Sequence, residues 1–279
     1  MKDAVMPTSA TAPRHQRSHG LASVSFAQLD GVTRLGRLRQ QGSAKAILPH
    51  IYRDVPEVVF LNTSGGLTGG DQLTYAVDLG PAARAVATTQ TAERAYAASS
   101  GRARVQNNFR IGAGGHLDWL PQETILFEGS AVARDTVVDL DADASCLLLE
   151  AVILGRRAMG ETLARVDFQD RRIVRRGGRL VHLEPTTLCD MTIGADRPAL
   201  LGQARAYASI VAVGLRYPDM LGALRGILDE PGVAAGASAL AGKLCVRMLA
   251  TDALAMRRQI LRALAVLRSD APLPRVWQS

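Results

Sequence analysis

The sequence is poor in cysteine and has no long apolar run. Its three cysteines, Cys146, Cys189 and Cys245, are far apart and odd in number, which argues against a disulfide framework and against a structural zinc site. No apolar stretch reaches the roughly 18 residues that a membrane-spanning helix needs. The basic N-terminus also lacks the apolar segment of a signal peptide. These absences predict a globular, cytoplasmic protein.

Lysine and aromatic residues are also scarce, although the chain is basic. The net charge of +7 comes almost entirely from arginine, because only three of the 33 basic residues are lysines. Aromatic residues make up 4% of the chain, and no segment interleaves arginines with the stacking rings that bind single-stranded nucleic acids. The densest basic patch, at 171–176, is typical of a solvated β-ribbon or of a docking surface for an acidic partner. A basic β-sheet module that binds nucleic acid or another anionic partner is therefore the alternative function.

The glycine-rich stretch at 62–71 lacks the lysine of a phosphate-binding loop. It contains four glycines: Gly65, Gly66, Gly69 and Gly70. Glycines in such number predict a tight connection between two strands, whereas a phosphate loop needs a lysine and a following helix. Ser64 lacks the strand–turn–helix context of a nucleophilic serine, and only five histidines are available as bases. We therefore expect no catalytic residue and no tightly bound cofactor.

Short alternating segments predict a mainly β fold. From residue 21 onward, apolar and polar residues alternate between turns rich in glycine, proline and aspartate, as in proteins built from stacked sheets. We predict strands at 22–29, 32–40, 43–48, 57–61, 72–79, 83–90, 103–111, 116–120, 123–128, 131–140, 144–154, 162–168, 171–176, 179–184 and 244–249. The predicted fold is therefore a sandwich-like pair of stacked antiparallel sheets with a few helices late in the chain.

The last third of the chain contains the predicted helices. Proline and aspartate at its start suit a helix at 218–228. Thr251 or Asp252 can cap a second helix that extends to about residue 268. Residues 203–214 fit either a helix or a strand.

The remaining segments are predicted to be irregular. We expect a loop at 232–242 and an extended C-terminal segment anchored by Trp277. Residues 1–20 lack periodicity and are predicted to be a disordered tail. Residues 21–279 then form a single domain.

Four carboxylates stand in unusual positions: Asp71, Glu93, Glu150 and Glu161. Asp71 ends the glycine-rich stretch, and Glu150 interrupts the most apolar run. A carboxylate in such a run is costly unless it is paired or hydrated. We therefore expect Glu150 to pair with Arg156 or Arg157, or to line an internal water-filled path, and the two interpretations are compatible.

Five segments, spread in order along the chain, form a recognisable pattern. They are Ser64-Gly65-Gly66-Leu67-Thr68-Gly69-Gly70-Asp71, Trp119-Leu120-Pro121-Gln122-Glu123-Thr124-Ile125, Gly155-Arg156 with Gly160-Glu161, Gly236-Ala237-Ser238, and Leu273-Pro274-Arg275-Val276-Trp277. With these segments the chain resembles the UreD (also called UreH) family of urease accessory proteins. It departs from the family in the lead-in Asn62-Thr63, where more histidine or proline is expected, and in its extended N-terminal tail.

The resemblance implies stacked β-sheets with a few helices and a non-catalytic role. Members of this family act as scaffolds or chaperones: with UreF and the GTPase UreG they bind apo-urease and help to insert nickel. GTP hydrolysis is then expected in UreG, and nickel is expected in transit, without tight binding. The resemblance also implies a dimeric assembly of the accessory complex, and an internal passage for nickel has been proposed for the family.

The resemblance and the unusual carboxylates together give a hypothesis for the site. Asp71, Glu150 and Glu161 line a nickel path as weak, transient ligands, and Arg156 orients one of them. Thiolate and imidazole clusters hold nickel tightly, so a protein that hands the ion on should avoid such clusters. Structural or partner-binding roles are assigned to Gly65, Gly66, Gly69, Gly70, Arg156 and Trp277.

Overall fold

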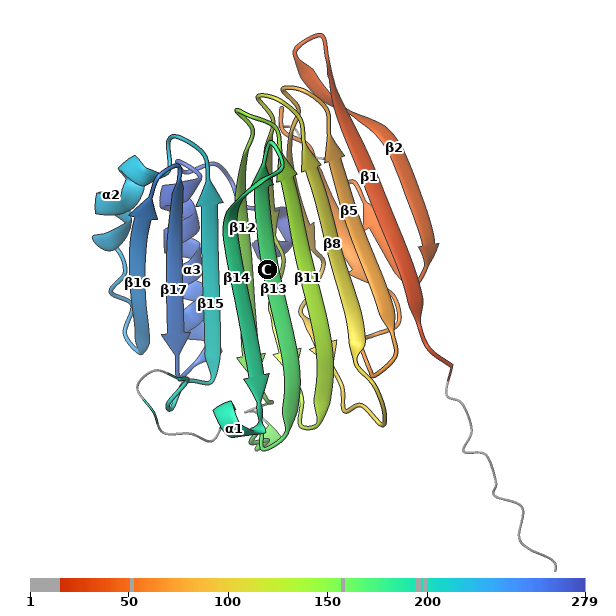
Figure 1. Ribbon diagram of the computed structural model, residues 1–279, viewed down its shortest axis with the longest axis vertical. Coiled ribbons are helices and arrows are strands. Elements are labelled where there is room, and N and C mark those ends of the chain that lie inside the picture. The colour runs from red at the N-terminus through yellow and green to blue at the C-terminus, as the bar shows by residue number, and fades with distance from the viewer. Residues whose placement is uncertain (1–15, 51–52, 157–158, 194–196, 198–199, 279) are drawn as a thin grey trace, which may run out of the picture.

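The chain winds into a flattened coil of β-strands in two stacked sheets (Figure 1). The computed structural model describes residues 16–50, 53–156, 159–193, 197 and 200–278. Most of the predicted N-terminal tail, residues 1–15, lies outside the described residues, and His19 and Gly20 already belong to the first strand. Among the described helices, none is both long and apolar enough to cross a membrane.

The first sheet has seven strands. In spatial order they are β14 (Arg179–Cys189), β13 (Val166–Arg176), β11 (Ser130–Leu140), β8 (Ala103–Ile111), β5 (Gln72–Leu79), β1 (His19–Leu29) and β2 (Val32–Gly42). The pairs from β13 to β1 are parallel, and only the outer pairs β1–β2 and β13–β14 are antiparallel.

The second sheet has ten strands. Eight follow in spatial order: β16 (Val233–Leu240), β17 (Lys243–Ala250), β15 (Ala206–Val213), β12 (Ser145–Leu154), β9 (His116–Leu120), β6 (Arg84–Thr89), β4 (Glu57–Asn62) and β3 (Ala44–Ile47). The short strands β10 (Thr124–Leu126) and β7 (Glu93–Ala95) branch from β12.

The order of the strands explains their direction. From β4 to β13 the chain crosses repeatedly from one sheet to the other, as in a solenoid, so each new strand lies beside one laid down a full turn earlier. Such neighbours run parallel. The mainly β, stacked-sheet fold is confirmed. The predicted antiparallel pairing is found between β1 and β2, β13 and β14, and β3 and β4, and among β12, β15, β17 and β16, whereas the other strand pairs are parallel.

Alternation along the strands places the core. In β8, residues are buried and exposed in strict alternation, because successive side chains point to opposite faces. In β12, seven of the eight residues from Cys146 to Ile153 are buried. Both of its faces are covered, one by the inside of the coil and the other by the second apolar cluster around the C-terminal helix.

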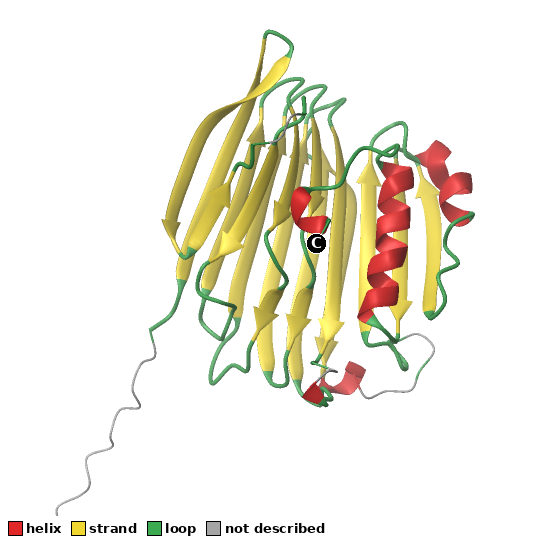
Figure 2. Cartoon of the chain, turned by 180° about the vertical axis from the view of Figure 1, so that it is seen from behind, coloured by secondary structure: helices red, strands yellow, loops and turns green. Residues whose placement is uncertain are grey.

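The C-terminal helix α3 (Ala253–Leu267) lies along the outer face of the ten-stranded sheet (Figure 2). Asp252 caps it as predicted, since its carboxylate accepts from two backbone N–H groups of the first turn. Shorter elements are α1 (Asp190–Ile193), η2 (Pro218–Met220), α2 (Leu221–Arg225) and η3 (Arg275–Trp277). Trp277 is buried.

Several predicted boundaries are wrong. The expected loop at 232–242 is mostly strand β16, which pairs residue by residue with β17. The two strands predicted at 162–168 and 171–176 are one continuous strand, β13. The helix expected at 218–228 ends at Arg225, and the undecided segment at 203–214 contains strand β15.

Candidate functional site

A row of polar side chains crosses the inside of the coil. Tyr75, Asn107, Thr136, Arg172 and Glu184 lie at one register on five neighbouring strands, β5, β8, β11, β13 and β14. All five residues are buried from solvent. We call these five residues the polar row. Because each comes from a different turn of the coil, the row runs along the coil axis rather than along any strand.

The ten-stranded sheet faces this row with polar residues of its own. Glu150, Ser209 and Arg247 are register neighbours on β12, β15 and β17. Arg172 donates to the backbone oxygen of Ser209 at 3.2 Å, and the Ser209 hydroxyl donates to Glu184 at 3.0 Å. The two sheets therefore meet through hydrogen bonds and charges at this level of the coil.

Glu150 lies at the centre of a buried ion cluster. Its Oε2 is 2.8 Å from the Arg134 guanidinium, and its Oε1 accepts from Trp119 Nε1 at 3.2 Å. Arg134 in turn makes a two-bond contact with Asp170 at 2.9 and 3.0 Å. Burial raises the pKa of Glu150 against the lowering effect of Arg134. The predicted partner Arg156 is wrong, since Arg156 pairs with Glu161 and a strand of the facing sheet supplies the arginine. The alternative partner, Arg157, lies outside the described residues.

Glu184 forms a second cluster at the β14 end of the row. It is 2.5 Å from Arg172 and 3.0 Å from Arg247, whose side chain reaches solvent. Burial acts to raise its pKa, but the neighbouring His182 and the two arginines outweigh it and lower the pKa to about 2. Glu184 is therefore a firmly ionised carboxylate.

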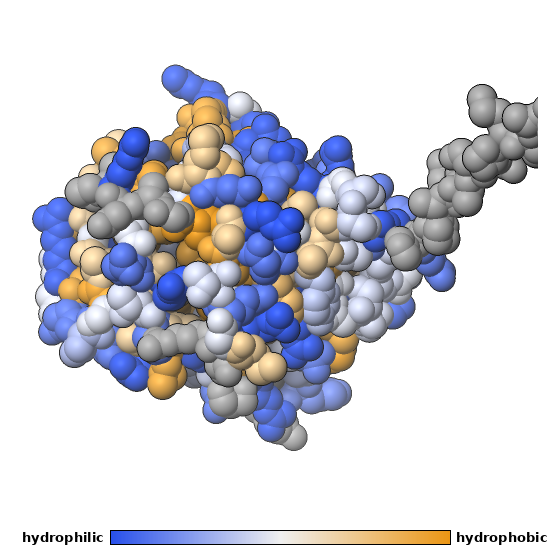
Figure 3. Space-filling model, turned by 90° about the horizontal axis from the view of Figure 1, so that it is seen from below, coloured by the Kyte–Doolittle hydropathy of each residue, from blue (hydrophilic) through white to orange (hydrophobic). Residues whose placement is uncertain are grey.

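Cavities lie at both ends of the polar row. A chamber of about 40 Å³ is lined by Tyr75, Asn107, Glu93 and Glu150, and a cleft of about 100 Å³ shares Tyr75 and Glu93 with it. At the other end, a cavity of about 540 Å³ is lined by Glu184 and by apolar residues of β14 to β17. The lower face, where β14 ends and β15 begins, carries apolar patches among hydrophilic side chains (Figure 3).

Glu93 stands between the chamber and the cleft. Its Oε1 accepts from Asn62 Nδ2 at 3.3 Å. Burial raises the pKa of Glu93 to about 7, with a small further contribution from the negative charge of Asp71. The glycine-rich stretch therefore reaches this end of the row through Asn62 and Gly65, both of which line the cleft.

Asp71 itself holds the glycine-rich stretch closed. Its Oδ1 accepts from the backbone of Ser18 and its Oδ2 from the backbone of Thr68, both at 2.8 Å. Gly66 has a φ of 151°, and a Cβ there would lie 2.4 Å from the Tyr96 ring. These contacts support the structural role assigned to the stretch, and both oxygens of Asp71 are engaged.

Glu161 is held by hydrogen bonds from Arg156 on a different turn of the coil. Its carboxylate accepts from the Arg156 guanidinium at 3.0 and 3.1 Å and from the Arg156 backbone at 2.9 Å. These hydrogen bonds lower the pKa of Glu161. Arg156 also stacks over Phe127 at 4.2 Å. Arg156 therefore orients Glu161, as the hypothesis required of one carboxylate.

The three carboxylates predicted to line a nickel path are not brought together. Glu150 lines the chamber, whereas Asp71 and Glu161 are engaged in separate loops. In the described part of the chain, no group of three or more His, Cys, Asp and Glu side chains is placed to hold a metal. The role of these three residues as metal ligands stays a prediction.

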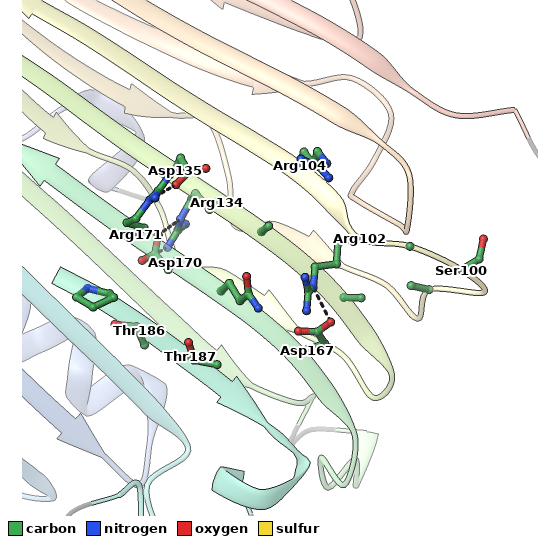
Figure 4. A pocket seen from close by; sticks show the side chains of 16 residues that line it. Ser100, Arg102, Arg104, Arg134, Asp135, Asp167, Asp170, Arg171, Thr186 and Thr187 are labelled. Carbon is green, nitrogen blue, oxygen red and sulfur yellow. Dashed lines mark hydrogen bonds and ion pairs between the residues drawn. The ribbon is translucent and has the colours of Figure 1, made fainter. Parts of the chain in front are cut away.

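The basic patch at 171–176 divides between the two faces of β13. Arg172 points inward, so it is not solvated as a β-ribbon residue would be. Arg171 points outward into a groove of about 880 Å³ and pairs with Asp135 at 2.7 Å, and Arg102 pairs there with Asp167 at 2.6 Å (Figure 4). Much of the outer basic charge is thus matched by carboxylates of neighbouring strands.

Sequence reasoning missed most of the polar row and its partners. Asn107 is the lone polar residue at an inward position of β8, and Thr136 and Arg172 likewise interrupt the apolar inward residues of β11 and β13, together with Arg134 and Asp170. That interruption of the alternation is the signal that could have found them.

The fold and the site define a β-solenoid protein whose interior carries a row of ionised and polar side chains. The chain belongs to the UreD family of urease accessory proteins, because the family model for the UreD urease accessory protein matches residues 18–278. It is 56% identical over 271 residues to the urease accessory protein UreD of Cereibacter sphaeroides, covering 96% of this chain and 98% of the relative.

Other relatives agree along nearly the whole length. The UreD protein of Paracoccus denitrificans is 50% identical, with 100% of this chain and 96% of the relative covered. That of Rhizobium leguminosarum bv. viciae is 43% identical, with 98% and 99% covered. The resemblance inferred from the five sequence segments is therefore confirmed.

Proposed function

We propose that this chain is a non-catalytic maturation factor that, with UreF and the GTPase UreG, binds apo-urease in the cytoplasm and helps to insert nickel. Membership of the urease accessory family supports a role in urease maturation. The single observation that carries the nickel role is the polar row, which links a chamber at Glu93 to a cavity at Glu184 through an otherwise apolar coil.

The chemistry of the row suits transfer rather than storage. The carboxylates of Glu184 in the row and of Glu150 on the facing sheet are hard oxygen donors, and the clusters of thiolate or imidazole that hold nickel tightly are absent from the row. Glu150 and Glu184 are each already bound by an arginine. A cation that reaches either carboxylate competes with a guanidinium for the same oxygens, so its residence there is short.

The experiment replaces Glu150 by glutamine in a host that produces urease and the other accessory proteins. The nickel content of purified urease should fall several-fold, because the variant keeps the shape of the side chain but removes its charge. Asp139→Asn is the matched control, since Asp139 lies on the outer face and pairs with Arg175 at 3.5 Å. Full nickel loading by a folded Glu150→Gln chain would exclude Glu150 from the route.

Two further variants test the other predicted ligands. Asp71→Asn and Glu161→Gln remove carboxylates that serve loops rather than the row. If nickel passes along the row, these variants should lower nickel loading only as far as they lower the amount of folded chain. A specific loss of nickel in either variant would place the route through the loops instead.

Binding of nucleic acid is the second function considered, and the outer face gives it little support. Arg171 and Arg175 on β13 are paired with aspartates of the neighbouring strand β11, and Arg102 is paired with Asp167, which leaves fewer free cations for phosphates. Salt-sensitive binding of RNA by a chain that fails to co-purify with UreF and urease would favour this alternative. Co-purification of the three proteins would favour the maturation factor and would also report the assembly state of the complex.

A further inference from the structure

The first hairpin of the coil, β1 with β2, ends the seven-stranded sheet in an unpaired edge (Figure 1). Among the described strands only β1 pairs with β2, and no described backbone hydrogen bond reaches the other side of its 11 residues. Backbone N–H and C=O groups on that side are therefore available to an added strand. The edge contains no proline, so a partner strand can pair with it without missing a donor.

The inner face of this edge exposes two leucines. Leu35 and Leu38 stand opposite Phe26 and Val24 of β1. The two β1 residues are 2% and 0% exposed, whereas the leucines are 47% and 42% exposed. The difference arises because the facing ten-stranded sheet ends at β3, whose four residues leave β2 uncovered. Apolar side chains exposed beside an unpaired edge favour the addition of a strand from another chain.

The outer face of the same edge carries unmatched positive charge. Arg34, Arg37 and Arg39 stand opposite neutral residues of β1, and all three are exposed. Among the described residues none of the three forms an ion pair, in contrast to Arg171 and Arg175 on the outer face of β13. The sequence of β2 contains no acidic residue. The charge of this edge therefore favours an acidic partner.

The two faces of β2 together define the chemistry of the partner. A strand that pairs with β2 presents its own side chains to the same two faces, because successive residues of a strand point to opposite sides. Apolar residues on one side of it would contact Leu35 and Leu38, and carboxylates on the other would pair with the three arginines. Pairing from Arg34 to Arg39 takes roughly six residues. The matching segment is therefore short and extended, and alternates acidic with apolar residues.

Three other occupants fit this edge less well. A second copy of β2 would place three arginines against three arginines, and like charges across a strand pair are destabilising. Residues 1–15 of the chain itself supply a single carboxylate, Asp3. A single-stranded nucleic acid needs aromatic rings on which its bases stack. The aromatic residue of this hairpin, Phe26, is buried.

We propose that β2 docks an acidic, extended segment of a protein partner, which joins the seven-stranded sheet as an additional outer strand. Backbone hydrogen bonds along the edge hold the segment, while the leucines and arginines select its alternating sequence. No residue of the polar row takes part. The inference therefore goes beyond the proposed function and does not depend on the nickel route.

Fluorescence anisotropy of labelled peptides, titrated with the full-length chain, tests the docking. The probe is a synthetic peptide in which glutamate and valine alternate, and its control has the same composition with the glutamates grouped together. We expect saturable binding of the alternating peptide and at least about tenfold weaker binding of the grouped peptide, which cannot separate charge and apolar surface onto two faces.

Backbone pairing is tested with two N-methylated forms of the alternating peptide. One carries the methyl groups on its valines and the other on its glutamates, so each form blocks the N–H groups of one edge of the strand. Only one edge of the peptide faces β2, so we expect one form to lose binding and the other to keep it. Unchanged binding of both forms would overturn the addition of a strand.

Charge reversal on β2 separates specific docking from a folding defect. Arg37→Glu/Arg39→Glu should weaken binding of the glutamate peptide at least about tenfold and should bind a peptide with lysine in place of glutamate, a gain that misfolding cannot produce. Arg104→Glu/Arg110→Glu is the matched control, because these two exposed arginines lie on β8, which has neighbours on both sides. Equal losses in the two double variants would overturn the inference.

The other occupants are separate outcomes of the same experiment. A dimer of the chain alone in sedimentation, dissolved by Leu38→Ser, would assign the edge to a second copy. Tighter binding of an oligouridylate than of the alternating peptide, lost in Arg37→Glu/Arg39→Glu, would assign the arginines to nucleic acid. Either result would overturn the proposal, whereas weaker peptide binding by Leu38→Ser without a change in sedimentation would support it.

Discussion

Glu184 gives a prediction about acid stability that follows directly from its contacts. Its carboxylate is 6% exposed and is bound by Arg172, Arg247 and the Ser209 hydroxyl. Its pKa is about 2 in the folded chain, against an ordinary value of 4.5. At about 1.4 kcal/mol for each pH unit, this difference corresponds to about 3 kcal/mol of stability at neutral pH.

The sign of the effect is fixed by the lowered pKa. A carboxylate that is ionised in the folded chain and protonates more readily in the unfolded chain stabilises the fold fully above pH 4.5. That stability is lost progressively as the pH falls from 4.5 towards 2. Other carboxylates contribute to the same pH range, so the effect of Glu184 has to be isolated with a variant.

The contribution of Glu184 is isolated by urea unfolding of the unchanged chain and of Glu184→Gln, each at pH 7 and at pH 3. We expect Glu184→Gln to lower the free energy of unfolding by about 3 kcal/mol at pH 7, and by roughly 1 kcal/mol at pH 3, where much of the charge effect has gone. Glu161→Gln is the control, because its partner Arg156 is half-exposed and the pair should contribute at most about 1 kcal/mol. A Glu184→Gln penalty that does not change with pH would refute the charge argument.

Three substitutions outside the polar row test how the fold is held. Asp252→Ala removes the cap of α3 and should lower the free energy of unfolding by about 1 kcal/mol in urea titrations, with Asp252→Asn close to the unchanged chain. Gly66→Ala places a Cβ 2.4 Å from the Tyr96 ring and should cost about 2 kcal/mol, seen as a lower Tm. Trp277→Ala empties a buried site and breaks the bond from Nε1 to the backbone of Leu120, so it should cost about 4 kcal/mol, whereas Trp277→Phe should cost about half as much. An unchanged stability for any of the three alanine variants would contradict the corresponding contact.

Strand positions were predictable because alternation is a local property. The strand at 103–111 was predicted with the bounds that β8 has, since every second residue faces the core. Strand β16 was missed because its residues are small and include Gly236, and it is a strand only because β17 pairs with it. Strand β13 was divided at Gln169-Asp170 because a polar pair resembles a turn. Asp170 is instead buried against Arg134, a partner that no local pattern shows.

Of the candidate site, the sequence singled out only Glu93 and Glu150, for a related reason. Glu150 stood out because it interrupts a continuous apolar run, and the structure places it in the ion cluster. Its partner Arg134 looked like an ordinary polar residue of an alternating strand. The polar row exists only when five strands stand in register, and the register depends on the lengths of the turns between the sheets. The spacing of residues in the sequence does not by itself determine this register.

The fold does not require the polar row. Two residues further along the same strands, Val77, Phe109, Val138 and Val174 form the next row at a common register. These four residues are apolar and at most 1% exposed, and they join β5, β8, β11 and β13 through packing, whereas β14 places His182 at this register.

The comparison of the two rows shows how the buried charges affect the stability of the fold. Apolar residues in place of a buried ion pair are often neutral or more stable by about 1–4 kcal/mol, so an apolar row at the level of Asn107 and Arg172 would hold the coil at least as well. The Oδ1 of Asn107, which is buried without a hydrogen-bond partner among the described residues, adds a further cost of about 1–3 kcal/mol. Stability therefore does not account for the row, which is consistent with the role in nickel transfer proposed above.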